Sequence, residues 1–247
     1  MLTSIRGLIA ATLVAGSAMA VTPAFAQENE SGISISGNAA VVSQYRFRGV
    51  GLSGGDIAIQ GGIDLSHASG FYVGTWGSSI DGGLYGSTEL DIYGGWSGEV
   101  TSGVTADVGV LYYAYPNATP GFDADVVELY GSVAFALGPA ETTVGINYAP
   151  DQDGLGGTDN FYMYGDLSVG IPNTPVTLSA HLGYTDGALS PELLGGGTKN
   201  HGLDWALGAA FAITENLSVG ATYTGVQAPT VKNVTNDAVV ATLSISF

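Results

Sequence analysis

The chain has 247 residues, of which 39 are glycine and none is cysteine, and its 22 acidic and 5 basic residues give a net charge of −17. So negative a balance argues against nucleic acid and against an anionic membrane surface as a partner. After residue 26, no stretch approaches the roughly 18 consecutive apolar residues of a membrane-spanning helix, which excludes a helical membrane protein. A secreted soluble β protein and a β-barrel remain.

The amino-terminal residues 1–26 have the pattern of a secretory signal peptide. Arg6 precedes an apolar run over residues 7–20, and Ala24-Phe25-Ala26 places small residues at the cleavage spacing. Ala18-Met19-Ala20 is an alternative cleavage site with poorer spacing. We therefore expect a secreted protein whose single domain covers residues 27–247, and the lack of cysteine suits passage through an oxidising periplasm.

The rest of the chain consists of segments with alternating or β-rich character. Most are long enough for the roughly 9–11 residues that a tilted strand needs to cross a bilayer. The predicted strands cover residues 33–48, 56–66, 70–79, 87–98, 103–115, 124–137, 140–149, 159–171, 175–185, 202–213, 216–226 and 237–247.

The connections between these strands alternate in length. Short turns follow every second strand, at residues 67–69, 99–102, 138–139, 172–174 and 214–215. Longer segments rich in Gly, Pro and Asp follow the others, at residues 50–55, 82–86, 116–123, 150–158, 186–201 and 227–236. Transmembrane barrels have short periplasmic turns, longer extracellular loops and an even strand number. The sequence therefore predicts an all-β fold, a transmembrane antiparallel barrel of about 12 strands in the bacterial outer membrane.

Large apolar residues share one face of most predicted strands, and the charged residues share the other. Because a barrel in lipid turns its apolar face outward, the charged face should line the lumen. The predicted pore-lining residues are Arg46, Arg48, Asp64, Glu89, Asp91, Asp107, Glu128, Asp166 and Asp204. The strand at 70–79 cannot be assigned, since it carries large residues on both faces. Aromatic residues near strand ends are expected in the interfacial girdles; they are Tyr45, Phe47, Phe71, Tyr72, Tyr112, Tyr113, Tyr115, Phe161 and Tyr162.

The last predicted strand ends the chain on an aromatic residue. Counting back from Phe247, every second residue is apolar, including Ile245 and Leu243, and the residues between are mostly small and polar. A terminal aromatic with this alternation resembles the assembly signal of bacterial outer-membrane proteins. We expect the barrel-assembly machinery as a partner of this strand, and outer-membrane lipid and lipopolysaccharide as partners of the barrel.

Residues 41–81 carry the most specific motifs. A strand ends in Ser43-x-Tyr45-x-Phe47-Arg48-Gly49, and Ser69-Gly70-Phe71-Tyr72-x-Gly74-x-Trp76-x-Ser78 follows after a short Gly/Ser loop and Ala58-x-Gln60-Gly61-Gly62. With Glu89-Leu90-Asp91-x-Tyr93-x-Gly95 and the terminal strand, the chain resembles the TorF-type porins of proteobacteria over residues 27–247. The resemblance implies an outer-membrane barrel more firmly than any transported solute.

The charge pattern of the predicted lumen favours a passive channel. Rings of carboxylates in a pore favour cations, and two arginines beside them would create a transverse field at a constriction. We therefore expect diffusion of small hydrophilic solutes or cations. A closed barrel with a structural or surface-binding role is the alternative, either through salt bridges that plug the lumen or through the loop at residues 186–201 packed over the mouth.

Enzymatic and metal chemistry receive little support. His181 is predicted to face the lumen near Asp166 and Asp204, but Ser179 lies two residues away on the same strand, too far for a Ser-His nucleophile system. Asp151-Gln152-Asp153-Gly154 departs from the calcium-loop spacing at Leu155 and Tyr162. We expect no catalytic residues, no metal site and no cofactor.

Overall fold

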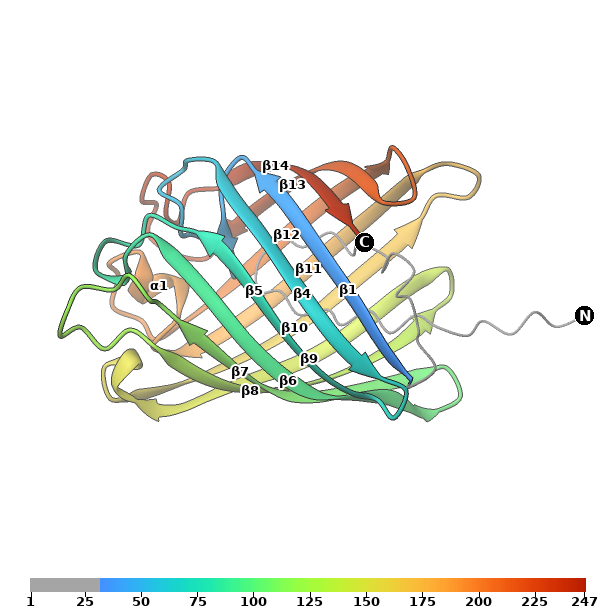
Figure 1. Ribbon diagram of the computed structural model, residues 1–247. Coiled ribbons are helices and arrows are strands. Elements are labelled where there is room, and N and C mark those ends of the chain that lie inside the picture. The colour runs from blue at the N-terminus through green and yellow to red at the C-terminus, as the bar shows by residue number, and fades with distance from the viewer. Residues whose placement is uncertain (1–31) are drawn as a thin grey trace, which may run out of the picture.

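The computed structural model describes residues 32–247 as one closed antiparallel barrel (Figure 1). The barrel order is β1-β14-β13-β12-β11-β10-β9-β8-β7-β6-β5-β4, so twelve strands form the wall, as predicted. The predicted signal peptide, residues 1–26, lies outside the described residues. The wall strands are β1 Ile33–Val42, β4 Ala58–His67, β5 Phe71–Ser79, β6 Thr88–Thr101, β7 Val104–Ala114, β8 Val126–Leu137, β9 Ala140–Gln152, β10 Thr158–Gly170, β11 Val176–Gly187, β12 His201–Ala212, β13 Leu217–Val226 and β14 Ala238–Ser246.

The first and last strands close the barrel. β1 pairs with β14 from Asn38 opposite Ser246 to Val42 opposite Thr242. The backbones of Gly37 and Phe247 exchange hydrogen bonds of 2.8 and 3.0 Å, which extend the seam to the last residue. A Cβ at Gly37 would lie 2.7 Å from the Phe247 ring, so only glycine leaves room for that ring across the seam. A role of Phe247, Ile245 and Leu243 in assembly stays a prediction.

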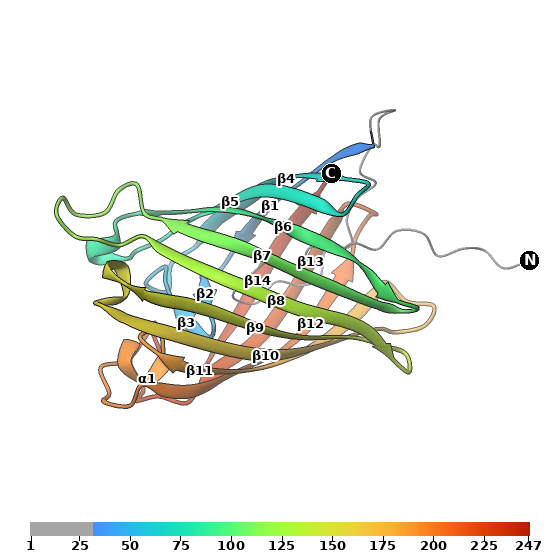
Figure 2. The same cartoon turned by 90° about the horizontal axis from the view of Figure 1, so that it is seen from below.

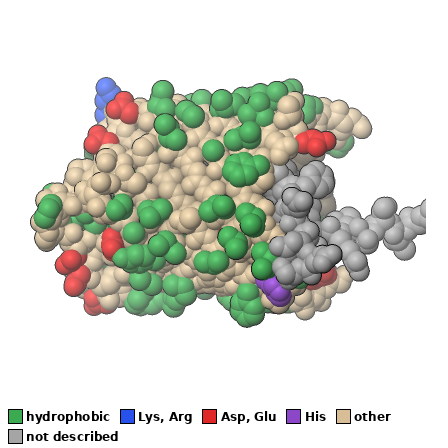
Figure 3. Space-filling view, viewed as in Figure 1, with side chains coloured by type: hydrophobic (Ala, Val, Ile, Leu, Met, Phe, Trp, Pro, Cys, Tyr) green, Lys and Arg blue, Asp and Glu red, His purple; other side chains and the backbone are tan. Residues whose placement is uncertain are grey.

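The outer face of the barrel is apolar. Figure 3 shows hydrophobic side chains spread over the wall, and most of the acidic side chains visible lie at the end that carries α1, Pro191–Leu194. The alternation predicted for the strands is confirmed, and β5 is now assigned, with Phe71 and Val73 exposed outside and Trp76 buried inside. Examples of outward side chains along the strands are Ile59, Ile92, Leu129, Leu182, Leu207 and Val239, all exposed. Leaving so much apolar surface in water would be unfavourable, which indicates that lipid covers this belt.

The first predicted strand, 33–48, is wrong at its carboxyl end. β1 ends at Val42, and the chain then turns into the barrel instead of continuing along the wall. Residues 43–57, here called the luminal hairpin, contain the short strands β2, Arg46–Phe47, and β3, Val50–Gly51, which pair only with each other. Figure 2 shows them within the ring of wall strands, near the end that carries α1. The connection at 50–55, predicted as an exposed loop, therefore belongs to an internal structure.

A two-residue turn forms the tip of the luminal hairpin. Phe47 pairs with Val50, so Arg48 and Gly49 are the turn residues, with φ angles of +46° and +77°. Two successive positive φ angles are typical of the tight turns that match strand twist. Glycine adopts positive φ angles freely. A positive φ at an arginine costs on the order of 1–3 kcal/mol, so other contacts must hold Arg48 in this conformation.

The remaining connections follow the predicted segregation by length. The short turns lie at the end of the barrel where β1 begins and β14 ends, and the longer connections lie at the other end (Figure 1). Those longer segments contain η1, Gly83–Tyr85, η2, Asp153–Leu155, and α1. Within residues 32–247, no helix is long and apolar enough to span a membrane.

A charge placed on the apolar belt should cost stability according to its depth. Leu207 lies at the middle of β12 and Leu137 at the end of β8, and both are about 60% exposed on the outer face. Leu207→Arg should lower the free energy of unfolding by about 2–4 kcal/mol, and Leu137→Arg by about 0–1 kcal/mol. Denaturant titration of the barrel refolded in lipid vesicles measures both, and equal costs would contradict a lipid-facing belt.

Candidate functional site

The acidic residues predicted to face the lumen do so. They lie on β4 (Asp64), β6 (Glu89, Asp91), β7 (Asp107), β8 (Glu128), β10 (Asp166) and β12 (Asp204). Contacts across the interior show their direction, because they skip a strand: Tyr93 of β6 donates to Asp64 of β4 at 2.6 Å, and Tyr72 of β5 donates to Asp107 of β7 at 2.6 Å.

The predicted placement of Arg46 and Arg48 on the first strand of the wall is wrong. Both lie on the luminal hairpin and are buried. Alternation along one strand predicted their direction correctly as inward, but it could not predict that the backbone itself leaves the wall.

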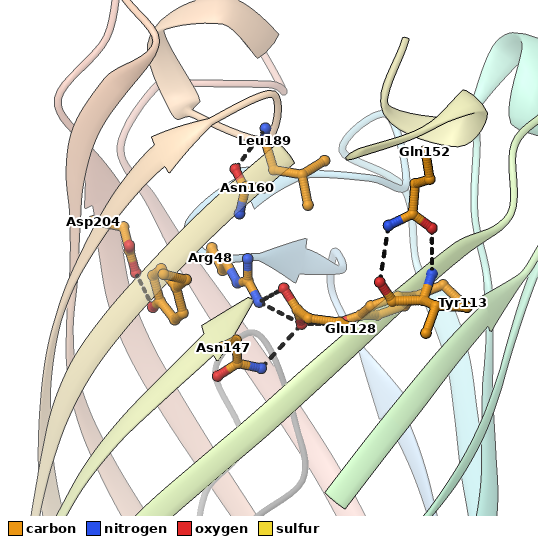
Figure 4. A network of polar contacts seen from close by, with 10 residues as sticks. Arg48, Tyr113, Glu128, Asn147, Gln152, Asn160, Leu189 and Asp204 are labelled. Carbon is orange, nitrogen blue, oxygen red and sulfur yellow. Dashed lines mark hydrogen bonds and ion pairs between the residues drawn. The ribbon is translucent and has the colours of Figure 1, made fainter. Parts of the chain in front are cut away.

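Arg48 at the hairpin tip forms an ion pair with Glu128 on the opposite wall (Figure 4). One guanidinium nitrogen, Nη2, lies 2.8 Å from each carboxylate oxygen. Glu128 also accepts hydrogen bonds of 3.0 Å from Tyr113 Oη and from Asn147 Nδ2. The guanidinium carbon stands 4.0 Å from the centre of the Tyr162 ring, a cation–π distance. The wall therefore surrounds this cation with a fixed carboxylate and an aromatic face.

The ion pair leaves donors of Arg48 unused. Nε and Nη1 are buried and have no hydrogen-bond partner among residues 32–247. A guanidinium usually meets a carboxylate with two nitrogens side by side, and each buried donor left unpaired costs about 1–3 kcal/mol. The contact holds the hairpin, but its geometry is not the best that these two groups can adopt.

Arg46 secures the other side of the luminal hairpin without a carboxylate. Its Nη1 donates to the carbonyl oxygens of Gly49, Val234 and Asn236 at 3.0, 3.2 and 2.8 Å. Gly51 N also donates to Val234 O at 2.8 Å, so the last long loop, residues 227–237, is tied to the hairpin. Loop and hairpin thus form one continuous structure at this end of the barrel.

Aromatic side chains fill the remaining contacts between hairpin and wall. Tyr45 stands edge-on to Trp76 with 5.6 Å between ring centres, and its hydroxyl donates to Glu89 at 2.9 Å. Phe47 stands edge-on to Tyr113 at 5.8 Å. The predicted place of Tyr45, Phe47, Tyr113 and Tyr162 in the interfacial girdles is wrong, because all four are buried in the lumen.

Side chains fill the lumen at the level of the luminal hairpin. Arg46, Glu89, Glu128, Asn160 and Asp204 are each 0 or 1% exposed. Such burial of charged groups requires that side chains fill the space between hairpin and wall. The hairpin therefore constricts the half of the lumen nearest α1. The loop of residues 186–201 contributes to this constriction, because Ala188 and Leu189 pack against the same core cluster as Tyr45 and Phe47.

Burial acts on both arginines. By itself it lowers the pKa of Arg48, but the neighbouring Glu128 carboxylate outweighs it and the net pKa lies above the ordinary value. Burial lowers the pKa of Arg46, only partly opposed by Asp237. Guanidinium groups stay protonated in proteins, so both arginines carry their charge into the lumen.

Near the middle of the wall strands, inward-facing tyrosine rings lie against glycines. Tyr93 faces Gly74, Tyr130 faces Gly109 and Tyr164 faces Gly145 in the strand register. A Cβ at each of these glycines would collide with the facing ring. Glycine thus allows the rings to lie flat on the wall rather than project into the lumen. The composition of the chain does not predict these tyrosine–glycine pairs. The register of the predicted strand pairs is the signal that could have matched each tyrosine with its glycine.

His181 lies between two carboxylates. Its Nδ1 is 2.7 Å from Asp166 and its Nε2 is 2.9 Å from Asp204, with Tyr162 Oη also 2.9 Å from Nε2. Because ionised carboxylates only accept hydrogen bonds, both ring nitrogens are placed to donate, as in the imidazolium form. Neither nitrogen is then available to activate Ser179 as a general base.

The described loops offer little for a metal ion. Within residues 32–247, no three His, Asp or Glu side chains gather as a metal site. Asp153 begins η2 and, with Asp123 and Asp125, lines an open cavity of about 350 Å³ between two long loops. The calcium interpretation of residues 151–159 gains no support from this arrangement.

The architecture defines a porin-type barrel, and comparison with known proteins agrees. The chain belongs to the bacterial family Gcw_chp, described as proteins of unknown function, whose model matches residues 26–247. No curated protein matches the chain. The solved structure of the KdgM porin superposes with a TM-score of 0.56 at 10% identity, covering 86% of this chain and 98% of that one. The NanC porin gives a TM-score of 0.56 at 10% identity, covering 87% and 99%. At such identity the likeness shows the fold.

Breaking the hairpin ion pair should be costly. Arg48→Ala leaves Glu128 buried without its cation and should lower the free energy of unfolding by about 3–5 kcal/mol. Glu128→Gln should have a similar effect. The double variant should lose much less free energy of unfolding than the sum of the two single losses. Lys199→Ala is the comparison variant, because Lys199 is 60% exposed in its 3.4 Å pair with the mostly buried Glu192, and a pair with one solvated partner should contribute only about 0–1 kcal/mol. Urea unfolding in vesicles measures all four; additive losses would contradict a direct coupling.

The flat tyrosine rings can be tested at one glycine. Gly145→Ala should force the Tyr164 ring off the wall and cost about 1–3 kcal/mol, because the added methyl meets the ring. Gly165→Ala is the control, since the nearest atom to its Cβ would lie 4.0 Å away. Unfolding midpoints of the two variants should differ clearly, and equal midpoints would show that the ring does not rest on Gly145.

Proposed function

We propose that the protein is an outer-membrane channel for passive diffusion of small hydrophilic solutes, that it favours cations, and that the luminal hairpin gates it. The observation that carries this proposal is a closed barrel with an apolar outer belt and an acidic lumen whose extracellular half is filled by a hairpin separate from the wall. The porin fold supports a channel, and the resemblance to TorF-type porins agrees with it.

The cation preference follows from the charge balance of the lumen. Arg48 compensates Glu128, and His181 bridges Asp166 and Asp204. Asp64 and Asp107 receive only tyrosine hydroxyls, and no basic side chain among residues 32–247 pairs with either. A pore with surplus carboxylates concentrates cations and repels anions.

The location follows from the same features. An apolar belt, strands that cross at bilayer length and the signal peptide predicted over residues 1–26 suit export to the outer membrane of a Gram-negative bacterium. There the belt would meet lipid and lipopolysaccharide, and the strand ending at Phe247 would be the segment that the assembly machinery receives.

A closed barrel with a structural or surface-binding role is the second candidate. The dry contact between the luminal hairpin and the wall favours it, because a hairpin that never leaves would block passage. The two candidates differ in one property, the conductance of the folded protein.

Removing the luminal hairpin tests the proposal. Val42 and Ala58 are paired at the ends of β1 and β4, so a two-residue Asn-Gly turn can replace residues 43–57 without breaking the wall. In planar bilayers the wild-type channel should open intermittently, and the shortened variant should conduct steadily and several-fold more.

The reversal potential in a salt gradient provides the second readout of that experiment. Both proteins should favour cations, because Asp64 and Asp107 stay in place on the wall. A folded, heat-modifiable shortened barrel that does not conduct would overturn the channel, and equal conductance of the two proteins would overturn the gate.

A further inference from the structure

The contacts around Arg48 form a complete cation site built by the wall. Glu128 on β8 supplies the carboxylate, and Tyr113 on β7 and Asn147 on β9 each donate to it at 3.0 Å. Tyr162 on β10 supplies the aromatic face, 4.0 Å from the guanidinium carbon. These four residues, here called the Glu128 cradle, lie on successive strands of the barrel wall. Figure 4 shows Tyr113, Glu128 and Asn147 beside Arg48.

The cation in this cradle arrives on a separable part of the chain. β2 and β3 pair only with each other, and no ladder joins them to the wall. The hairpin is held by side chains and by the loop at residues 227–237. At its base, Ser43 N donates to Ala241 O of β14, and Leu52 O accepts from Asp81 N, both at 2.8 Å. Arg48 therefore relates to the cradle as a tethered ligand relates to its receptor.

The tethered ligand fits the cradle incompletely. Only Nη2 reaches Glu128, and the backbone of Arg48 has a φ of +46°. Nε and Nη1 are buried, and no residue in the described part of the chain accepts from them. A free guanidinium has no backbone to constrain it and can turn two nitrogens toward the carboxylate while lying flat on the ring. Such a cation has better geometry available than the residue that occupies the site.

We propose that the Glu128 cradle is a binding site for small organic cations that carry a guanidinium group, and that Arg48 occupies it as an internal competitor. Binding of the external cation releases the hairpin tip. A compact ammonium cation offers no planar face to Tyr162 and no paired donors to Glu128, so the cradle discriminates against it. The consequence for permeation rests on the proposed channel function, whereas the binding itself does not.

Chemical rescue of an emptied cradle tests the binding. Arg48→Ala removes the internal competitor, and methylguanidinium chloride at millimolar concentration serves as the probe. It should raise the unfolding midpoint of the refolded Arg48→Ala barrel by about 2 °C or more, and methylammonium chloride at the same concentration should not. The Arg48→Ala/Glu128→Gln double variant is the matched control and should show no rescue. Equal shifts in the two variants, or none in Arg48→Ala, would overturn the proposal.

A second readout covers a variant that folds poorly. If Arg48→Ala fails to refold alone, its refolding yield with methylguanidinium is compared with its yield with methylammonium. Arg48→Lys, which keeps a charge at the tip, is titrated with methylguanidinium, and its unfolding midpoint is measured. Selective rescue of yield supports the cradle, and its absence together with an unresponsive Arg48→Lys overturns it.

Ion flux separates this inference from the proposed function. In vesicles that contain the wild-type protein, methylguanidinium should raise potassium flux saturably, because it competes with Arg48. Selective rescue of Arg48→Ala with no flux in any variant would support the cradle and overturn the channel, whereas steady flux without rescue would support the channel and overturn the cradle.

Discussion

The ion pair between Arg48 and Glu128 is the contact on which the arrangement of the lumen depends. Desolvation makes a buried ion pair expensive, so such a pair contributes little net stability, but breaking it by removing one partner is strongly destabilising. Here both side chains are at most 2% exposed. The pair therefore fixes where the hairpin lies rather than how stable the barrel is. Tyr45 and Phe47 pack beside it, and the carbonyl contacts of Arg46 join the hairpin to the last long loop.

The second constraint is that every wall strand must be apolar outside and polar inside. Period-two alternation satisfies it, with Leu129 outside and Glu128 inside as neighbours on β8. The bulky inward tyrosines would narrow the lumen if they stood upright, and the glycines opposite them let the rings lie flat. A wall built this way can enclose both a separate hairpin and the partly exposed pair of Asp166 and His181, whose side chains are 35% and 26% exposed.

Most of the wall could be predicted from the sequence because its signal is local. Alternation located the strands to within a few residues, and glycine, proline and aspartate located the connections. The luminal hairpin could not be predicted, since Tyr45, Arg46, Phe47 and Arg48 continue the alternation of β1 while the chain leaves the wall. Only the long-range partners, such as Glu128 at a separation of 80 residues, decide that path. The Arg48-Gly49 pair in the tip is a turn signal that the alternation concealed.

The account is tested most directly by the accessibility of the hairpin in the folded protein. Because the chain has no cysteine, single cysteines report without background. Val50→Cys in the hairpin, where Val50 is 3% exposed, and Leu84→Cys in a long loop, where Leu84 is 55% exposed, are treated with a charged maleimide in vesicles. The account predicts fast labelling at position 84, slow labelling at position 50, and faster labelling at position 50 once Arg48→Ala is added. Equally fast labelling at both positions in the otherwise unchanged protein would contradict a hairpin held inside the barrel.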